Sequence, residues 1–371
     1  MGTRFKTILQ KIIYTIYLLS LFGYIESAQS CIKESSLKLI ANKYAKGFKI
    51  YQGKSIYLIK TKNQKILISN EKNKICSEYL SVISPVKKAV VMSTTHLAVL
   101  EMLGEHQSLV GFPDNKLITS PNIAALVNGN KITNLDYPFN REKILLIKPD
   151  IIMGYSASVF DEESLVQLEK LSQLVILNDD FKEESLLARA EWIKFVALFY
   201  DKLNLAQKIF DDIEKSYINT KALVKNFKKP KVLVGQNNHG IWSAPGGNSD
   251  IVKLISDAGG DYIWKDKKTS KTLQMSIEAV WSKLMESEIW LTQNTWFNMA
   301  ELKNSDDKYL KLKVVQTGRI YNHILKVNKW KNMNYWETGI MRPDLLIKDL
   351  VIIFHPNVLA GEQTIWYDKL K

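Results

Sequence analysis

The most chemically suggestive residues in this sequence are aromatic side chains that fall in predicted loops. After residue 230 the chain carries Trp242, Trp264, Trp296, Trp330 and Trp336, and several of them stand next to turn residues. Aromatic side chains at loop positions bury a large area and lose few rotamers, which suits a bulky, flat or hydrophobic ligand. The alternative is that they pack a hydrophobic core, and this alternative stays open for each tryptophan taken singly.

Motifs of common catalytic, nucleotide-binding and metal sites are absent from the sequence. It contains no Walker loop, no G-x-G-x-x-G, no G-x-S-x-G elbow and no H-E-x-x-H pair. Two cysteines cannot make a four-thiolate metal site. We therefore expect no enzyme activity, no resident metal and no cofactor. An enzyme would need a catalytic cluster assembled by the fold, and the sequence offers only five scattered histidines: His96, His106, His239, His323 and His355.

Two glutamates occupy matching positions in the two halves of the chain. Glu142 follows Asn140, and Glu278 follows Ser276, each just ahead of residues with helical periodicity. An acid in the first turn of a helix complements the helix dipole and contributes about 0.3–1 kcal/mol, so capping alone explains each glutamate. The repeated placement nevertheless suggests a shared role.

Hydrophobic periodicity predicts the helices and strands that position these residues. Short apolar runs alternate with helical patterns in two separate stretches, which predicts two α/β lobes with parallel sheets, and ligands bind such sheets at the carboxyl ends of the strands. We expect strands at Ala89–Met92, Leu109–Gly111, Ile151–Gly154 and Leu174–Leu177, and again at Val232–Val234, Ile289–Leu291, Val314–Val315 and Ile320–Tyr321.

The two lobes are separated by a helical stretch, 183–226, that contains no glycine or proline. We expect a break near Asp201, with Asn204 capping a second helix long enough to bridge the lobes. Ahead of the first lobe, residues 38–80 alternate apolar and polar side chains, which predicts a small antiparallel β-extension. The expected domains are a signal peptide (1–30), the β-extension (31–85), the N-terminal lobe (86–203), the linker helix (204–226) and the C-terminal lobe (227–371).

The N-terminus has the features of an export signal. Arg4, Lys6 and Lys11 precede the uncharged segment Ile12–Ile25, and small residues lead up to Cys31. We expect cleavage before Cys31 and lipidation of that residue, which would make the protein a membrane-anchored lipoprotein in the periplasm or on the cell surface. The alternatives are an uncleaved anchor helix and a disulfide between Cys31 and Cys76.

The chain is basic, with 51 Lys and Arg against 38 Asp and Glu and a net charge of +13. A solvated lysine-rich surface explains this charge, and an anionic ligand or an anionic membrane also fits it. Nucleic acid is disfavoured, because the lysines are scattered rather than gathered in one stripe.

Several segments together resemble the class III periplasmic solute-binding proteins of iron-complex and cobalamin ABC importers. NREKILLIKPDIIMG (Asn140–Gly154) is the most specific match, and the resemblance covers about residues 40–360. Further matches are VVMSTTHLAVLEMLGEHQSLVGF (Val90–Phe112), GGNSDIVKLISDAGGDYIW (Gly246–Trp264), NYWETGIMRPDLLIKDLVIIFHP (Asn334–Pro356) and YAKGFKI (Tyr44–Ile50).

The resemblance implies two lobes on one rigid helix, with limited hinge motion and a ligand in the cleft between the lobes. The ligand it implies first is a ferric siderophore or similar iron complex, then cobalamin, then haem. It also implies a monomer in which Glu142 and Glu278 dock on arginines of the permease dimer.

Two functions from other classes remain as alternatives. One is a hydrolase or redox enzyme on a nitrogenase-like scaffold, and the other is a structural surface lipoprotein. The ligand-binding candidates are Thr94, Thr95, His96, Phe112 and Tyr155 in the first lobe, and Asn238, His239, Trp242, Trp296, Tyr335 and Trp336 in the second.

Overall fold

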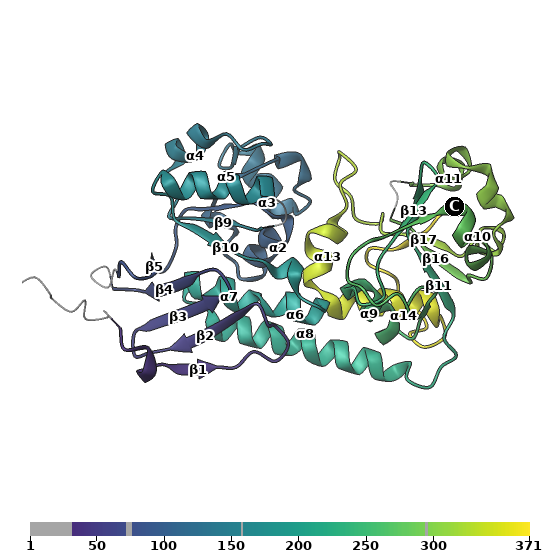
Figure 1. Ribbon diagram of the computed structural model, residues 1–371, viewed down its shortest axis with the longest axis horizontal. Coiled ribbons are helices and arrows are strands. Elements are labelled where there is room, and N and C mark those ends of the chain that lie inside the picture. The colour runs from purple at the N-terminus through teal and green to yellow at the C-terminus, as the bar shows by residue number, and fades with distance from the viewer. Residues whose placement is uncertain (1–31, 72–75, 157–158, 294–295) are drawn as a thin grey trace, which may run out of the picture.

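The computed structural model describes residues 32–71, 76–156, 159–293 and 296–371, so the predicted signal peptide and Cys31 lie outside the described residues. It has two α/β lobes joined by a long helix, with a small β-sheet at the N-terminal end (Figure 1). This is the fold class that the sequence predicts. None of the described helices is both long and apolar enough to cross a membrane.

The N-terminal lobe is built on a parallel sheet of order β10-β9-β6-β7-β8. Successive residues of its central strands enter two different cores, since Val90 and Ile152 belong to one hydrophobic cluster and Val91 and Met153 to the other. Burial on both faces explains the continuous apolar runs in the sequence. The elements are β6 (Ala89–Val91), α2 (Thr94–Met102), β7 (Leu109–Phe112), α3 (Pro121–Asn128), β8 (Thr133–Asn134), α4 (Arg141–Ile147), β9 (Ile151–Gly154), α5 (Val159–Lys170) and β10 (Val175–Leu177).

The C-terminal lobe has a second sheet, of order β14-β11-β16-β17-β18, in which only β18 runs antiparallel to its neighbour. A three-stranded antiparallel sheet, β12-β13-β15, lies beside it. The elements are β11 (Lys231–Val234), β12 (Gln236–Asn238), β13 (Ile241–Ala244), α9 (Asp250–Asp257), β14 (Asp261–Tyr262), β15 (Leu273–Ser276), α10 (Ile277–Met285), β16 (Ile289–Leu291), α11 (Met299–Ser305), α12 (Lys313–Gln316), β17 (Ile320–Asn322), α13 (Thr338–Met341), α14 (Pro343–Phe354) and β18 (Asp368–Lys369).

The strand predicted at Val314–Val315 is wrong, because both valines lie in the short helix α12. The two side chains are buried. An apolar run of two residues has too little periodicity to distinguish a buried strand from a buried helical turn.

The connector between the lobes is α8 (Leu203–Leu223), whose 21 residues span about 32 Å. The expected break precedes it at Asp201, which has φ 56°. Asn204 does not cap the helix: Lys202 stands at the N-cap and Asn204 lies in the first turn. At its far end α8 is tied to the C-terminal lobe, where the Tyr217 hydroxyl donates to Asp257 at 2.8 Å.

The β-extension contains β1 (Lys38–Ile40), β2 (Phe48–Gln52), β3 (Ile56–Thr61), β4 (Lys65–Ser69) and β5 (Leu80–Ile83) in sequential order. It is not wholly antiparallel, as the alternation had suggested, because β5 runs parallel to β4. Alternation of apolar and polar residues marks a strand but does not report the direction of its neighbour.

Two buried glutamates fasten the extension to the N-terminal lobe. Glu191 accepts the backbone N–H groups of residues 43–45, at 2.8–2.9 Å, and the ammonium of Lys194 at 2.7 Å. Glu183 accepts the N–H of Gly47 at 2.8 Å and the indole N–H of Trp192 at 2.9 Å. A Cβ on Gly47 would lie 2.6 Å from the Trp192 ring, so the close approach requires glycine.

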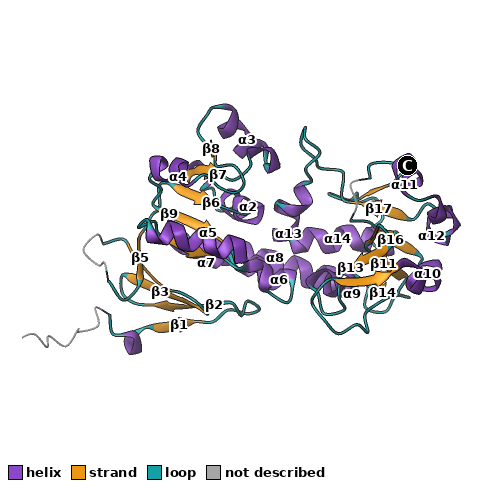
Figure 2. Ribbon diagram, turned by 45° about the horizontal axis from the view of Figure 1, so that its top comes forward, coloured by secondary structure: helices purple, strands orange, loops and turns teal. Residues whose placement is uncertain are grey.

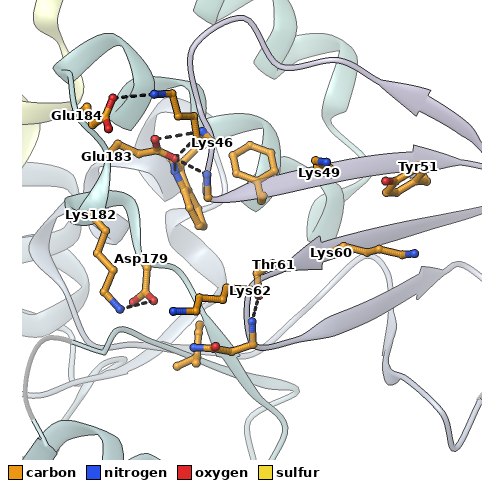
Figure 3. Close-up of a pocket in the computed structure, with 15 residues that line it drawn as sticks. Lys46, Lys49, Tyr51, Lys60, Thr61, Lys62, Asp179, Lys182, Glu183 and Glu184 are labelled. Atoms are coloured by element: carbon orange, nitrogen blue, oxygen red, sulfur yellow. Dashed lines mark hydrogen bonds and ion pairs between the residues drawn. The ribbon is translucent and has the colours of Figure 1, made fainter.

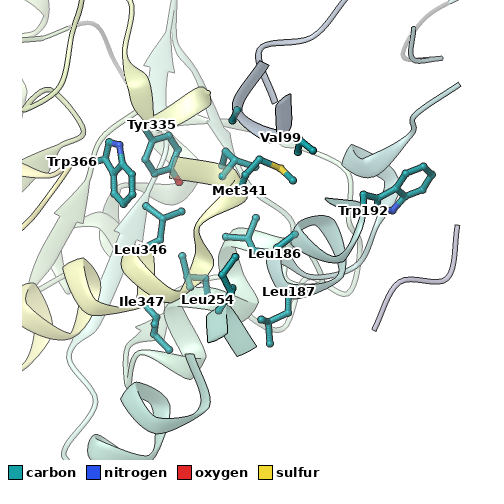
Figure 4. Packing of buried hydrophobic residues seen from close by; sticks show 14 of the residues in the cluster. Val99, Leu186, Leu187, Trp192, Leu254, Tyr335, Met341, Leu346, Ile347 and Trp366 are labelled. Atoms are coloured by element: carbon teal, nitrogen blue, oxygen red, sulfur yellow. The ribbon is translucent and has the colours of Figure 1, made fainter. Parts of the chain in front are cut away.

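One hydrophobic cluster runs through the base of the molecule and joins the lobes (Figure 4). Val99 of the N-terminal lobe, Leu186 between the lobes and Met341 and Leu346 of the C-terminal lobe are all buried in it. Figure 2 shows α13 between the two lobes, and it packs against both α2 and α6 (Leu186–Glu191). The two lobes therefore share one continuous hydrophobic core at the base.

Candidate functional site

A cavity of about 260 Å³ lies at the carboxyl ends of β6, β7 and β9 in the N-terminal lobe. This is the edge at which parallel sheets bind ligands. Much of its wall is aromatic, and Thr94 supplies a hydroxyl. The lining residues are Met92, Ser93, Thr94, Phe112, Pro113, Leu117, Tyr137, Phe139, Tyr155 and Leu165.

The structure brings three predicted residues, Thr94, Phe112 and Tyr155, together around this cavity. A fourth, Trp336 of the C-terminal lobe, adjoins them, because its carbonyl accepts the Thr94 hydroxyl at 3.0 Å. The Trp336 side chain is 47% exposed. The backbone of Trp336 therefore reaches the edge of the cavity at the start of α2, while its ring packs against those of His323 and Tyr335.

Two further predicted residues, Thr95 and His96, are buried beneath the cavity. The Thr95 hydroxyl donates to Asp180 at 2.9 Å, and the His96 ring meets Tyr155 edge to face at 6.4 Å. Burial lowers the pKa of His96, so its imidazole is neutral at neutral pH. These side chains position Tyr155 and the start of α2.

Tyr335 is buried under Trp336 in a group of rings. Its ring lies 4.4 Å from that of His323 and 5.7 Å from that of Tyr367. Burial raises the pKa of Tyr335 well above its usual range and lowers the pKa of His323 to about 4. Tyr335 therefore supports Trp336 from behind.

Four predicted residues of the C-terminal lobe do not join the cavity. Trp242 is fully buried in β13, 5.7 Å from the ring of Trp290. Trp296 packs against the same Trp290. Asn238 and His239 are exposed at the turn between β12 and β13. Trp242 therefore packs the hydrophobic core and does not face a ligand.

The cavity also contains two aromatic residues that the sequence analysis missed, Tyr137 and Phe139. They lie in the irregular segment between β8 and α4, where no periodicity marks a side chain as facing a cavity. Their position beside a proline, Pro138, was the one available signal.

A segment of the C-terminal lobe, residues 328–337, crosses to the N-terminal lobe, and we call it the inter-lobe strap. Asn328 donates to the carbonyls of Lys116 at 2.7 Å and Ile118 at 2.9 Å. Glu337 accepts the N–H groups of Thr119 at 2.8 Å and Ser120 at 3.0 Å. These bonds hold one lobe against the other beside the cavity.

The two matching glutamates are both exposed in the first turn of their helices, Glu142 on α4 and Glu278 on α10. The side chain of Asn140 caps α4, as expected. Ser276 instead donates its hydroxyl to Glu278 at 2.5 Å. Leu146, one turn along α4 from Glu142, is 82% exposed.

Within the described residues, no three or more His, Cys, Asp or Glu side chains are grouped to hold a metal ion. Cys76 is buried and disulfide-bonded. The lipidation predicted for Cys31 concerns a residue outside the described part of the chain.

Comparison with known proteins gives consistent matches. A family model described as "Periplasmic binding protein" matches residues 90–323. An uncharacterized lipoprotein of Methanocaldococcus jannaschii is 24% identical over 82% of this chain and 76% of its own. A possible iron-binding periplasmic solute-binding protein of Staphylococcus epidermidis has a TM-score of 0.57 at 15% identity, over 73% of this chain and 99% of its own. The periplasmic vitamin B12 binding protein of Vibrio cholerae has a TM-score of 0.51 at 15% identity, over 72% of this chain and 96% of its own.

Proposed function

Because the chain belongs to the periplasmic binding protein family, we propose that it is the exported receptor of an ABC importer for a ferric siderophore or similar iron complex. The receptor captures the complex between its lobes and delivers it to the permease. The observation that carries this proposal is the aromatic cavity at the carboxyl ends of β6, β7 and β9, at whose edge Thr94 donates to the backbone carbonyl of Trp336 in the other lobe.

The chemistry of the cavity supports a bulky metal complex as the ligand. Phe112 and Tyr155 offer flat apolar surfaces, and Thr94 offers a hydroxyl at the boundary between the lobes. A volume of about 260 Å³ takes part of such a ligand, and the remainder would lie against Trp336. Stacking on aromatic faces and a few hydrogen bonds are the usual means of holding a large flat ligand.

Cobalamin or haem is the alternative ligand, since the same aromatic surfaces suit a corrin or a porphyrin. One similar structure is that of a vitamin B12 binding protein, and another is titled as a haem-binding protein. Catalysis is not part of the proposal, because Thr95 and His96 are buried beneath the cavity, where they contact Asp180 and Tyr155.

Docking on the permease is assigned to Glu142 and Glu278. Each is a solvent-exposed carboxylate in the first turn of a helix, one helix on each lobe. The exposed Leu146 beside Glu142 gives this surface an apolar contact of the kind found at protein interfaces. Charges at the edge of such an interface set the encounter rate and the register of the complex.

The protein is proposed to act outside the cytoplasm. The names of two relatives call them lipoproteins, which fits a lipid on Cys31. The disulfide-bonded state of Cys76 favours the other alternative, a Cys31–Cys76 disulfide, because the chain has no third cysteine. We adopt the disulfide and test it below.

The proposal is tested by titrating the purified protein with ferric siderophores, ferric citrate, cobalamin and haem while following tryptophan fluorescence. We expect one of them to quench the emission saturably, and Trp336→Ala to weaken its binding about tenfold or more through the lost stacking area. Trp330→Ala is the matched control, since Trp330 is 46% exposed and Trp336 47%. No saturable response from any of these compounds would contradict the proposal.

A further inference from the structure

The positive charge of the chain is concentrated in the β-extension. Residues 32–83 contain eleven lysines and three glutamates, a net charge of +8. Residues 84–371 carry a net charge of only +3. Two of these lysines help to hold the extension, since Lys43 pairs with Glu214 of α8 and Lys46 with Glu184. Most of the excess charge takes no part in this attachment, which rests also on apolar packing and on buried carboxylates.

Three of these lysines form a row across neighbouring strands. Lys49 on β2 is the register partner of Lys60 on β3, and Lys60 is the partner of Lys65 on β4. Like charges directly opposite each other destabilise a sheet. Glu34 forms ion pairs with Lys60 and Lys65. The side-chain ammonium group of Lys49, in contrast, has no hydrogen bond or ion pair among the described residues.

Two lysines of the row, Lys49 and Lys60, line a groove between the extension and the N-terminal lobe, with a volume of about 780 Å³ (Figure 3). We call it the basic groove. Lys62, on the turn after β3, is a second lysine in its wall with no hydrogen bond or ion pair to the rest of the described chain. The groove is lined by Lys46, Gly47, Phe48, Lys49, Tyr51, Lys60, Thr61, Lys62, Asn63, Leu177, Asp179, Lys182, Glu183, Glu184 and Trp192.

The acidic residues of the groove are already occupied. Glu184 pairs with Lys46 at 2.7 Å, and Asp179 pairs with Lys182 at 2.8 Å. Glu183 accepts backbone and indole N–H groups. The ammonium groups of Lys49 and Lys62 therefore remain uncompensated at the wall of a cavity large enough for a small molecule.

We propose that the basic groove binds a multiply charged, phosphate-bearing oxyanion through Lys49 and Lys62, at a site separate from the cleft between the lobes. Phosphate oxygens are strong acceptors for ammonium groups, and two phosphates can neutralise both lysines. The group can belong to a soluble compound or to a lipid headgroup, and the experiment separates these sources. The site shares no residue with the cavity beneath Trp336.

The experiment measures binding of pyrophosphate by calorimetry and of phosphatidylglycerol vesicles by sedimentation, with phosphatidylcholine vesicles as the neutral reference. The protein is the mature chain, without residues 1–30. We expect Lys49→Gln/Lys62→Gln to weaken binding about tenfold or more, as loss of two charge-assisted contacts requires. Pyrophosphate binding identifies a soluble ligand, and binding to the anionic vesicles alone identifies a lipid headgroup.

Two controls make the result specific. Lys225→Gln/Lys228→Gln removes two exposed lysines after α8, at the other end of the molecule, and should leave binding unchanged. Trp336→Ala should also leave pyrophosphate binding unchanged. The melting temperature of Lys49→Gln/Lys62→Gln should stay equal to that of the wild type or rise, since Lys49 opposes Lys60. Three results would overturn the proposal. They are an equal loss of binding in Lys225→Gln/Lys228→Gln, unchanged binding in Lys49→Gln/Lys62→Gln, and no binding of pyrophosphate or of anionic vesicles to the wild type.

Discussion

At the residue scale, His323 gives the molecule a specific acid sensitivity. It is buried among the rings of Tyr335, Trp336 and Tyr367, and neither of its ring nitrogens has a hydrogen-bond partner in the described chain. Burial lowers its pKa from 6.5 to about 4. Between these two pH values the unfolded chain binds more protons than the folded one, so the free energy of unfolding falls as the pH drops through this window.

The variant His323→Phe should remove this part of the acid sensitivity. Phenylalanine keeps the aromatic packing and cannot titrate, so the loss of unfolding free energy between pH 7 and pH 4 should shrink by up to about 3 kcal/mol. Urea denaturation at several pH values measures this change in the free energy of unfolding. His239→Asn is the control, because His239 is exposed with φ 50°, a conformation that asparagine tolerates. An acid sensitivity equal to that of the wild type would refute the assignment.

The chemical state of the two cysteines distinguishes a disulfide-bonded mature protein from a lipid-anchored one. Cys76 is disulfide-bonded, and Cys31 is the one other cysteine in the sequence. We predict that maleimide labels no thiol in the denatured mature protein before reduction and two thiols after it. One reactive thiol without reduction, together with partition into detergent, would show instead that Cys31 carries a lipid.

At the scale of elements, we expect the inter-lobe strap to limit how far the lobes separate. The Glu337 carboxylate accepts two N–H groups at the start of α3, where the helix dipole favours a negative charge. The double variant Asn328→Ala/Glu337→Gln removes the bonds of Asn328. In the glutamine an NH2 group replaces one of the two carboxylate oxygens, so one of the two backbone N–H groups loses its acceptor. We expect about 1–3 kcal/mol less stability and a broader distance distribution between spin labels on α3 and α11.

Glu362→Gln is the control for the strap, since Glu362 is exposed and lies outside the strap. It should change neither stability nor the distance distribution. A strap variant with wild-type stability and an unchanged distribution would show that the hydrophobic base alone fixes the lobes.

Hydrophobic periodicity was sufficient to predict most of the parallel strands and the long connector α8. It missed β8 and β14, which have two residues each and carry no apolar run. Runs such as Ile151–Gly154 are buried on both faces, and their pattern reports that burial directly. Periodicity failed where the run was too short, as at Val314, and where an aromatic residue near a turn was in fact core, as at Trp242. Tyr155 could be singled out because it directly follows the predicted strand Ile151–Gly154, at the edge where parallel sheets bind ligands.

The inter-lobe strap could not have been predicted from the sequence. Its bonds join Asn328 and Glu337 to backbone groups more than 200 residues away, and no local pattern marks an asparagine or a glutamate for such a partner. Tyr137 and Phe139 were missed for a related reason, since irregular segments carry no periodic signal.

At the scale of the whole molecule, the docking proposal separates the residues needed for uptake from those needed for ligand binding. Glu142 and Glu278 are exposed, and neither lines the cavity at Tyr155. We predict that Glu142→Ala/Glu278→Ala keeps wild-type ligand affinity in solution and abolishes uptake into cells. The control Glu163→Ala/Glu362→Ala, which changes two other exposed glutamates, should keep uptake. A parallel loss of affinity in the first variant would show that the glutamates belong to the ligand site.

The most direct test of the receptor proposal is the crystal structure of the mature chain with the tightest-binding compound of the titration. We predict one ligand between the lobes, in contact with Phe112 and Tyr155 on one side and Trp336 on the other. A ligand bound elsewhere, for example in the basic groove, or held by one lobe without contact to the other, would contradict the proposal.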